Sequence, residues 1–239
     1  MKINKVTITG ADDSVNINSL VDLQKKYPFV EWGILFSLKN TSHDRYPSSD
    51  WLGRFFAFIF KEKLNVSAHL CGTFAKEFML GKISHDSIAN TLSHLFPRLQ
   101  INFNFKTSGE FDLEKVVEFL KTKEKNEFIF QYNKSNESVL KDFLTKEKDL
   151  KNINMLFDSS GGRGTIIKQI STPLNVYTGY AGGLNPDNIS DFCKKVVAFP
   201  NDSRVWIDTE SGVRTNDKFD LTKVEKFLDI ASKFITYDY

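Results

Sequence analysis

Two glycine-bearing loops late in the chain have the composition of an anion-binding site. The first loop contains Gly182 and Gly183, and the second contains Ser211 and Gly212. Glycine has no side chain, so the N–H groups of such loops can approach an anion closely. The pairing predicts that the two loops together hold one phosphate group. Two tight turns without a ligand are the plainer alternative.

The apolar runs before these loops are interpreted as strands. They are Leu174–Tyr177 and Arg204–Ile207, so Gly179 is expected to belong to the first loop. Asn185 and Pro186 suit the cap and first turn of a following helix. In a closed β/α barrel, the loops after strands seven and eight commonly form a phosphate site.

Titratable residues end other strand-like runs. Asp158 follows Asn154–Phe157, where it could transfer protons or cap its own turn. His69 and Cys71 are two residues apart and would share one face of a strand. A neutral histidine beside a thiol could form a base and nucleophile pair. The ordinary alternative is a hydrogen-bonded histidine and a packed cysteine.

Amide side chains occur at two further strand ends. Asn102 and Asn104 alternate with apolar residues in Leu99–Phe105, and Gln131 lies near the end of Glu127–Tyr132. Alternation places the two asparagines on one face of that strand. If that face points inward, they predict a pocket that recognises hydroxyl or carbonyl groups.

The elements that must position these residues alternate regularly between strand and helix patterns. The predicted strands are Ile3–Thr9, Phe29–Phe36, Val66–Leu70, Leu99–Phe105, Glu127–Tyr132, Asn154–Phe157, Leu174–Tyr177 and Arg204–Ile207. The predicted helices include Asn18–Tyr27, Trp51–Lys63, Ala75–Leu80, His85–Leu95, Asp112–Lys123, Glu137–Lys148 and Leu221–Phe234. Eight such units predict a (β/α)8 TIM barrel that forms a single domain over residues 1–239. The first strand is followed by no glycine-rich fingerprint, which disfavours a dinucleotide-binding fold.

Composition narrows the class of protein. The net charge of +2 gives no bulk signal for nucleic acid. Two cysteines favour reduced thiols over a disulfide framework, and no cysteine spacing indicates a metal site. Neither a signal-peptide core nor an apolar run of membrane-spanning length is present. We therefore expect a cytoplasmic protein with no cofactor, no metal and no membrane partner; its oligomeric state stays open.

Motifs at both ends of the chain resemble one enzyme family. They are Thr7–Gly10, Asp44–Tyr46 with Ser48, Leu156–Asp158 followed by Gly161–Gly164, Ala181–Ile189 and Asp208–Val213. Together they resemble the phosphoribosylanthranilate isomerase family, which carries out the Amadori rearrangement of tryptophan biosynthesis. The resemblance is carried by both ends of the chain and is weak between about Leu64 and Lys151.

The resemblance implies roles for three positions. Asp158 matches the family's general acid, and Arg45 matches the arginine that holds the anthranilate carboxylate. Thr9 stands where the family has the cysteine that acts as general base. A threonine hydroxyl has no thiolate-like state near neutral pH, so a different base is required. His69 and Cys71 are the hypotheses for that base.

The leading hypothesis is an isomerase that moves protons on a small phosphorylated, sugar-like substrate. The predicted catalytic residues are Asp158, His69, Cys71 and Thr9, the substrate-binding residues are Arg45, Asn104 and Gln131, and the phosphate-binding residues are Gly182, Gly183, Ser211 and Gly212. One alternative is a barrel that binds a phosphorylated ligand without catalysis. The other is true phosphoribosylanthranilate isomerase activity with a different general base.

Overall fold

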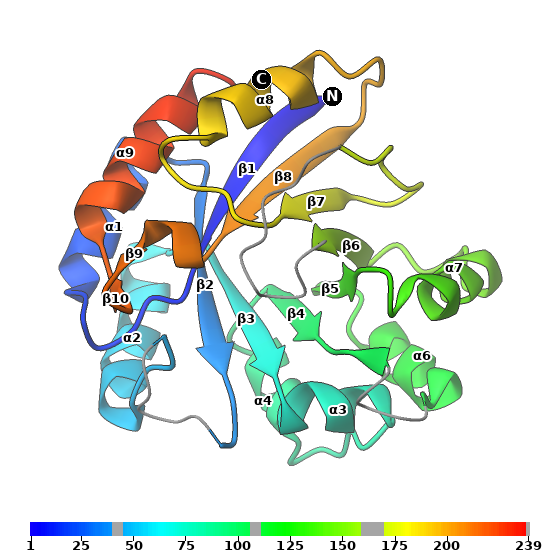
Figure 1. Ribbon diagram of the computed structural model, residues 1–239. Helices are drawn as coiled ribbons and strands as arrows, with labels where there is room; N and C mark the ends of the chain where they lie inside the picture. Colours follow the sequence, from blue (N-terminus) through cyan, green and yellow to red (C-terminus); the bar gives the residue numbers. More distant parts are fainter. Residues whose placement is uncertain (40–44, 106–110, 159–169, 238–239) are drawn as a thin grey trace.

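Eight parallel strands form a closed barrel, with helices packed around its outside (Figure 1). The computed structural model describes residues 1–39, 45–105, 111–158 and 170–237. Each strand pairs in parallel with the next along the chain, and the eighth pairs with the first. The predicted TIM barrel is therefore confirmed.

The strands and helices alternate along the chain much as the sequence predicts. The barrel strands are β1 (Lys2–Thr9), β2 (Val30–Phe36), β3 (Val66–Cys71), β4 (Arg98–Asn102), β5 (Glu127–Tyr132), β6 (Ile153–Asp158), β7 (Thr178–Ala181) and β8 (Arg204–Thr209). The helices are α1 (Ile17–Lys26), α2 (Ser49–Glu62), α3 (Thr73–Met79), α4 (Ile88–Ser93), α6 (Leu113–Thr122), α7 (Glu137–Lys146), α8 (Ile189–Val197) and α9 (Leu221–Ser232). A short 3-10 helix, η1 (Ser211–Val213), leads into a small hairpin of β9 (Arg214–Thr215) and β10 (Lys218–Phe219).

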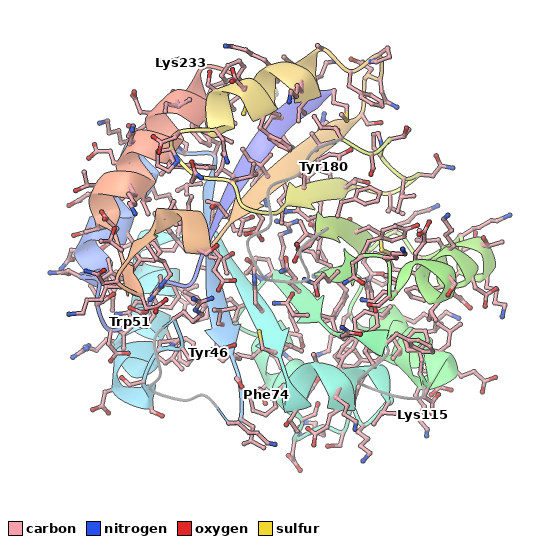
Figure 2. All side chains as sticks on the ribbon, viewed as in Figure 1. Tyr46, Trp51, Phe74, Lys115, Tyr180 and Lys233 are labelled. Atoms are coloured by element: carbon pink, nitrogen blue, oxygen red, sulfur yellow. The ribbon has the colours of Figure 1, made fainter. Side chains whose placement is uncertain are left out.

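Side-chain caps and aromatic packing fix the helices against the barrel. Ser48 caps α2, because its hydroxyl accepts a hydrogen bond from the Trp51 N–H. Trp51, labelled in Figure 2, stacks on Phe55 and donates from Nε1 to the Val15 carbonyl at 3.1 Å. None of the described helices combines the length and the hydropathy that crossing a bilayer requires.

The prediction for the seventh strand was wrong. The apolar run Leu174–Tyr177 precedes the strand, and β7 covers Thr178–Ala181. Gly179 therefore lies inside the barrel wall and not in the phosphate loop. A Cβ atom at Gly179 would meet the indole of Trp206 at 2.2 Å, so glycine is needed there for packing.

The fourth strand is shorter than predicted. It ends at Asn102, so Asn104 follows the strand and is exposed, while Asn102 alone of the two remains part of the barrel wall.

Charged and aromatic side chains pack inside the barrel near the end where the strands begin. Glu31 accepts from Arg98 at 2.7 Å and from Lys5 at 3.1 Å. Burial opposes ionisation, but the charges of Arg98 and Lys5 bring the pKa of Glu31 down to about 2. The Arg98 guanidinium lies over the ring of Trp206 at 4.7 Å. These side chains fill the interior of the barrel near the end where the strands begin.

Candidate active site

A cavity opens at the carboxyl ends of the strands. Its lining comes from seven strands and two turns: Thr9, His69, Gln100, Asn102, Gln131, Leu156, Asp158, Ala181, Gly182, Gly183, Leu184, Asp208, Thr209, Glu210 and Ser211. β2 contributes Gly33, where a Cβ atom would lie 2.6 Å from the Thr9 hydroxyl and 2.9 Å from His69 Nε2. Glycine at this position leaves room for the side chains of Thr9 on β1 and His69 on β3, the two strands that flank β2.

The two glycine-bearing turns lie against each other, as a shared anion site requires. Thr209 donates from Oγ1 to the Leu184 carbonyl at 2.6 Å. Gly212 packs so closely on the same carbonyl that a Cβ atom there would lie 1.8 Å from it. Gly212 therefore holds the turns together and does not line the cavity, whereas Ser211 does.

The first turn needs glycine for its backbone geometry. Gly182 and Gly183 have φ of 133° and 59°, values that residues with a Cβ atom rarely adopt. Asn188 donates from Nδ2 to the Gly183 carbonyl at 2.9 Å, which turns this carbonyl away towards α8. Within the described part of the chain, no backbone hydrogen bond uses the N–H of Gly182, Gly183 or Ser211. Three N–H groups at this rim therefore have no backbone acceptor in the described structure.

The helix that follows the first turn begins later than predicted. Asn185 caps a preliminary turn, since its Oδ1 accepts from the N–H groups of Asp187 at 2.8 Å and Asn188 at 3.2 Å. α8 itself starts at Ile189.

Asp208 is a buried carboxyl group with one unsatisfied oxygen. Its Oδ1 accepts from the Thr9 hydroxyl at 2.9 Å, and its Oδ2 has no partner among the described residues. Burial, opposed by the Thr9 hydrogen bond and reinforced by the charges of Glu210, Glu31 and Asp158, raises the pKa of Asp208 well above its usual range. A carboxyl group whose ionised form is disfavoured by burial therefore faces the cavity, and the hydroxyl of Thr9 positions it.

Asp158 lies on the same rim as Asp208. Strand pairing aligns Asp158 with Ala181 and Ala181 with Asp208, so the two aspartates flank β7 at one level. Neighbouring strands are spaced about 4.8 Å apart, which separates the two backbones by roughly 10 Å. Gln131 donates from Nε2 to Asp158 Oδ2 at 2.6 Å and orients that carboxyl group.

His69 lies inside the barrel with both ring nitrogens engaged. Nδ1 is 3.2 Å from Gln100 Nε2, and Nε2 is 3.1 Å from the Ser67 hydroxyl. Because the Gln100 amide nitrogen can only donate, Nδ1 is the acceptor and Nε2 carries the hydrogen. Burial lowers the pKa of His69 to about 4, so the ring is neutral at physiological pH.

Cys71 lies beside Asn102, on the side of the site away from Asp158. Asn102 donates from Nδ2 to Cys71 Sγ at 3.4 Å. Burial raises the pKa of the Cys71 thiol to about 11. A thiol in this state is a poor nucleophile. Cys71 and Asn104 line a second cavity that adjoins the first.

Arg45 reaches this second cavity but is already paired. Its guanidinium donates to Glu210 Oε1 at 2.7 Å and to Asp217 Oδ1 at 3.2 Å. Its backbone N–H donates to Asp12 Oδ2 at 2.9 Å, and its φ of 73° is left-handed. The predicted glycine run Gly161–Gly164 and the residue Asp44 lie outside the described residues.

The residues of the predicted site thus separate into two groups. One cavity collects Thr9, His69, Gln131, Asp158, Gly182, Gly183 and Ser211, and the adjoining one collects Arg45, Cys71 and Asn104 together with the shared Gln131. Among the described residues, no group of three or more His, Cys, Asp or Glu side chains is arranged to hold a metal ion.

One protein-family model matches the chain from its middle to near its end. The model of N-(5'-phosphoribosyl)anthranilate isomerase matches residues 110–230, just over half of the chain. The chain belongs to this family. The match includes Asp158, the turn at Gly182 and the β8 turn that carries Glu210, but it begins after Thr9 and Arg45. No curated protein sequence matches the chain.

Solved structures similar to this family member agree on the fold. N-(5'-phosphoribosyl)anthranilate isomerase from Pyrococcus furiosus has a TM-score of 0.56 at 17% identity, over 96% of this chain and 99% of that one. DAHP synthase from Thermotoga maritima has a TM-score of 0.55 at 10% identity, over 98% of this chain and 68% of that one. 3-Hexulose-6-phosphate synthase from Salmonella typhimurium has a TM-score of 0.51 at 9% identity, over 98% of this chain and 100% of that one. At these identities the similarity shows the barrel fold alone.

Sequence reasoning gave no role to two acidic residues that the structure places in the site. Asp208 and Glu210 follow the last strand-like run, Arg204–Ile207, so their position at the barrel mouth follows from the sequence. Their partners Thr9 and Arg45 are 199 and 165 residues away, and only the closed barrel brings them together. The signal that was available is the presence of two acidic residues, two apart, directly after a barrel strand.

Proposed function

We propose that this family member is an isomerase that moves protons on a small phosphorylated, sugar-like substrate at the mouth of the barrel. The observation that carries the proposal is the pair of rim carboxyl groups, Asp158 and Asp208, beside the glycine turn. Asp208 is buried, has a raised pKa and is unsatisfied at Oδ2, which is an arrangement that costs stability unless a ligand uses it.

The phosphate would lie on the turn formed by Gly182 and Gly183, within reach of Ser211. The left-handed backbone of both glycines, the packing of the two turns and the backbone N–H groups support this placement. Among the described residues that line this cavity there is no lysine or arginine. Backbone groups and the Ser211 hydroxyl would therefore supply the binding.

Isomerisation of an aldose-type carbon chain needs one group that removes a proton from carbon and one that protonates oxygen. Asp208, whose protonated form is favoured by burial, would donate a proton to the substrate oxygen. Asp158, oriented by Gln131, would remove the carbon-bound proton and return it to the neighbouring carbon, while Asp208 would recover its proton from the hydroxyl that becomes the new carbonyl. The assignment differs from the family resemblance, which gives Asp158 the acid role. It needs neither a thiolate at Cys71 nor a free imidazole nitrogen at His69.

A deuterium-exchange experiment in heavy water, followed by NMR, tests the proposal. The two compounds are D-ribose 5-phosphate and N-(5'-phosphoribosyl)anthranilate. The wild-type protein should catalyse exchange on at least one compound, and Asp158→Asn should slow it by about 10²–10⁴-fold. Protection against thermal unfolding by inorganic phosphate should be the same in both proteins. Exchange at the wild-type rate in Asp158→Asn would remove Asp158 from the mechanism.

Thr9, in place of the family's cysteine, favours one other candidate function, a barrel that binds a phosphorylated ligand without catalysis. In that case these compounds would raise the melting temperature and be recovered without deuterium or rearrangement. Growth of a tryptophan auxotroph that lacks phosphoribosylanthranilate isomerase would instead identify the family's own reaction.

A further inference from the structure

The second cavity lies directly beside the first and would receive the end of the substrate that is remote from the phosphate. The two cavities share Asn102, Gln131 and Glu210 in their walls. The second adds Asn104, Asn133 and the guanidinium of Arg45. Carboxamide groups both donate and accept hydrogen bonds, which suits hydroxyl groups.

Glu210 is paired with Arg45, the one cationic side chain among the described residues that line these cavities. Arg45 donates to Glu210 at 2.7 Å, with the two side chains only 29% and 26% exposed. Its other terminal nitrogen donates to Asp217 at 3.2 Å. A substrate carboxylate placed here would have to displace an acidic side chain that is already bonded to Arg45, and would then lie beside that displaced charge.

The pairing is built into the loops of the barrel and does not depend on two flexible surface side chains. Asp12 accepts from the Arg45 N–H and from Arg214, and the Arg214 side chain also donates to the Gly10 carbonyl at 2.6 Å. These contacts fix the backbone of the Arg45 loop against the loop after β1. Glu210 is fixed in turn by the end of β8 and by η1.

Glu210 lines both cavities, so a carboxylate placed beside Arg45 in the second would also lie beside Glu210. Like charges at short range repel each other, and they do so more strongly where water is partly excluded.

We propose that Glu210 is a specificity-determining residue which, by occupying Arg45, restricts the substrate to phosphorylated compounds whose remote end is an uncharged, hydroxyl-bearing chain. The inference rests on the proposed function, since it assumes that a phosphate anchors the ligand at the glycine turn. Substrates with a carboxylate at the remote end, including one on an aromatic ring, would therefore be excluded.

Two probes that differ at a single carbon test this directly. D-ribose 5-phosphate and D-ribonate 5-phosphate share the phosphate and the hydroxyl groups, but the second ends in a carboxylate. Calorimetric titration of the wild-type protein should show the ribonate binding at least about tenfold more weakly, and Glu210→Gln should remove or reverse that difference by releasing Arg45. Because the variant loses a negative charge, its affinity for inorganic phosphate should rise by a smaller factor than its affinity for the ribonate.

Glu225→Gln is the matched control. Glu225 pairs with Lys26 at the same 2.7 Å but lies on α9, on the exposed surface and away from the cavities. This variant should keep the wild-type preference. If Glu210→Gln does not fold, Asp217→Asn removes the more exposed partner of Arg45 and should shift the preference in the same direction by a smaller factor.

The possible failures are distinguishable. Equal or tighter binding of the ribonate by the wild-type protein would overturn the role of Glu210 and leave the phosphate site intact. An unchanged preference in a folded Glu210→Gln variant would do the same. Absence of binding by both sugar phosphates and by inorganic phosphate would overturn the proposed function, and this inference with it.

Discussion

Replacing Asp208 with asparagine should stabilise the protein at neutral pH while abolishing proton transfer. The Asp208 carboxyl group is 5% exposed, and its Oδ2 has no partner in the described structure. Asparagine has nearly the same shape and can still accept the hydrogen bond of the Thr9 hydroxyl through its Oδ1. It removes a group whose ionisation the folded protein opposes.

The pH dependence follows from the direction of the pKa shift. Burial raises the pKa of Asp208 in the folded protein, so the folded state binds more protons than the unfolded state between the usual carboxyl range and the raised pKa. The stability of the wild type therefore falls as pH rises through that window. Below the window both states are protonated, and ionisation of Asp208 costs nothing. The asparagine side chain of the variant does not ionise, so the advantage of the variant should grow with pH.

The size of the gain follows from proton linkage. Each pH unit between the unfolded and the folded pKa of Asp208 costs the wild type about 1.4 kcal/mol. For a domain of this length each kcal/mol shifts the melting temperature by about 2–4 °C. We therefore expect the advantage of Asp208→Asn over the wild type to grow by about 3–6 °C for each pH unit within that window, so that it is larger at pH 8 than at pH 5.

Melting curves at pH 5 and pH 8 for wild type, Asp208→Asn and the control Asp191→Asn provide the assay. Asp191 is exposed on α8, so its substitution should change the melting temperature little at either pH. A loss of stability in Asp208→Asn at pH 8, or a gain of the same size at both pH values, would refute the reasoning that this carboxyl group is buried with a raised pKa.

Two further predictions concern the barrel interior. Arg98→Met should destabilise the fold by about 3–5 kcal/mol in chemical denaturation, because it leaves the buried Glu31 without its principal counter-charge. Adding Glu31→Gln should recover part of this loss, and a loss below about 1 kcal/mol in the single variant would contradict the assigned ion pair. Gly179→Ala should lower the free energy of unfolding by about 1–3 kcal/mol or more, because its Cβ atom would overlap Trp206. Gly53→Ala is the control: it lies in open space on α2 and should be neutral or stabilising. Equal changes in stability for the two variants would contradict the packing argument.

The fold was largely predictable because each element carries its own local pattern. Helices such as α2 and α9 have apolar residues at helical spacing and a side-chain cap at the first turn. β7 was misplaced because its interior position is Gly179, which has no apolar side chain, while the more apolar Val176 and Tyr177 precede it. The space that defines this strand is filled by Trp206 from its neighbour, and no local pattern contains that information.

The site was predictable in its position but not in its electrostatics. Strand ends indicated that Asp158, Gln131 and the glycine turns gather at one rim, and the structure places them there. The occupation of Arg45 by Glu210 and the burial of Asp208 depend on contacts between the first and last units of the barrel. Because pKa values follow from burial and from neighbouring charges, the protonation states of these groups are properties of the fold as a whole.

A crystal structure with D-ribose 5-phosphate bound tests the central claim most directly. The account predicts the phosphate on the N–H groups of Gly182 and Gly183 beside the Ser211 hydroxyl, with the sugar between the carboxyl groups of Asp158 and Asp208. A phosphate bound elsewhere on the barrel, or a sugar out of hydrogen-bonding reach of both aspartates, would contradict it.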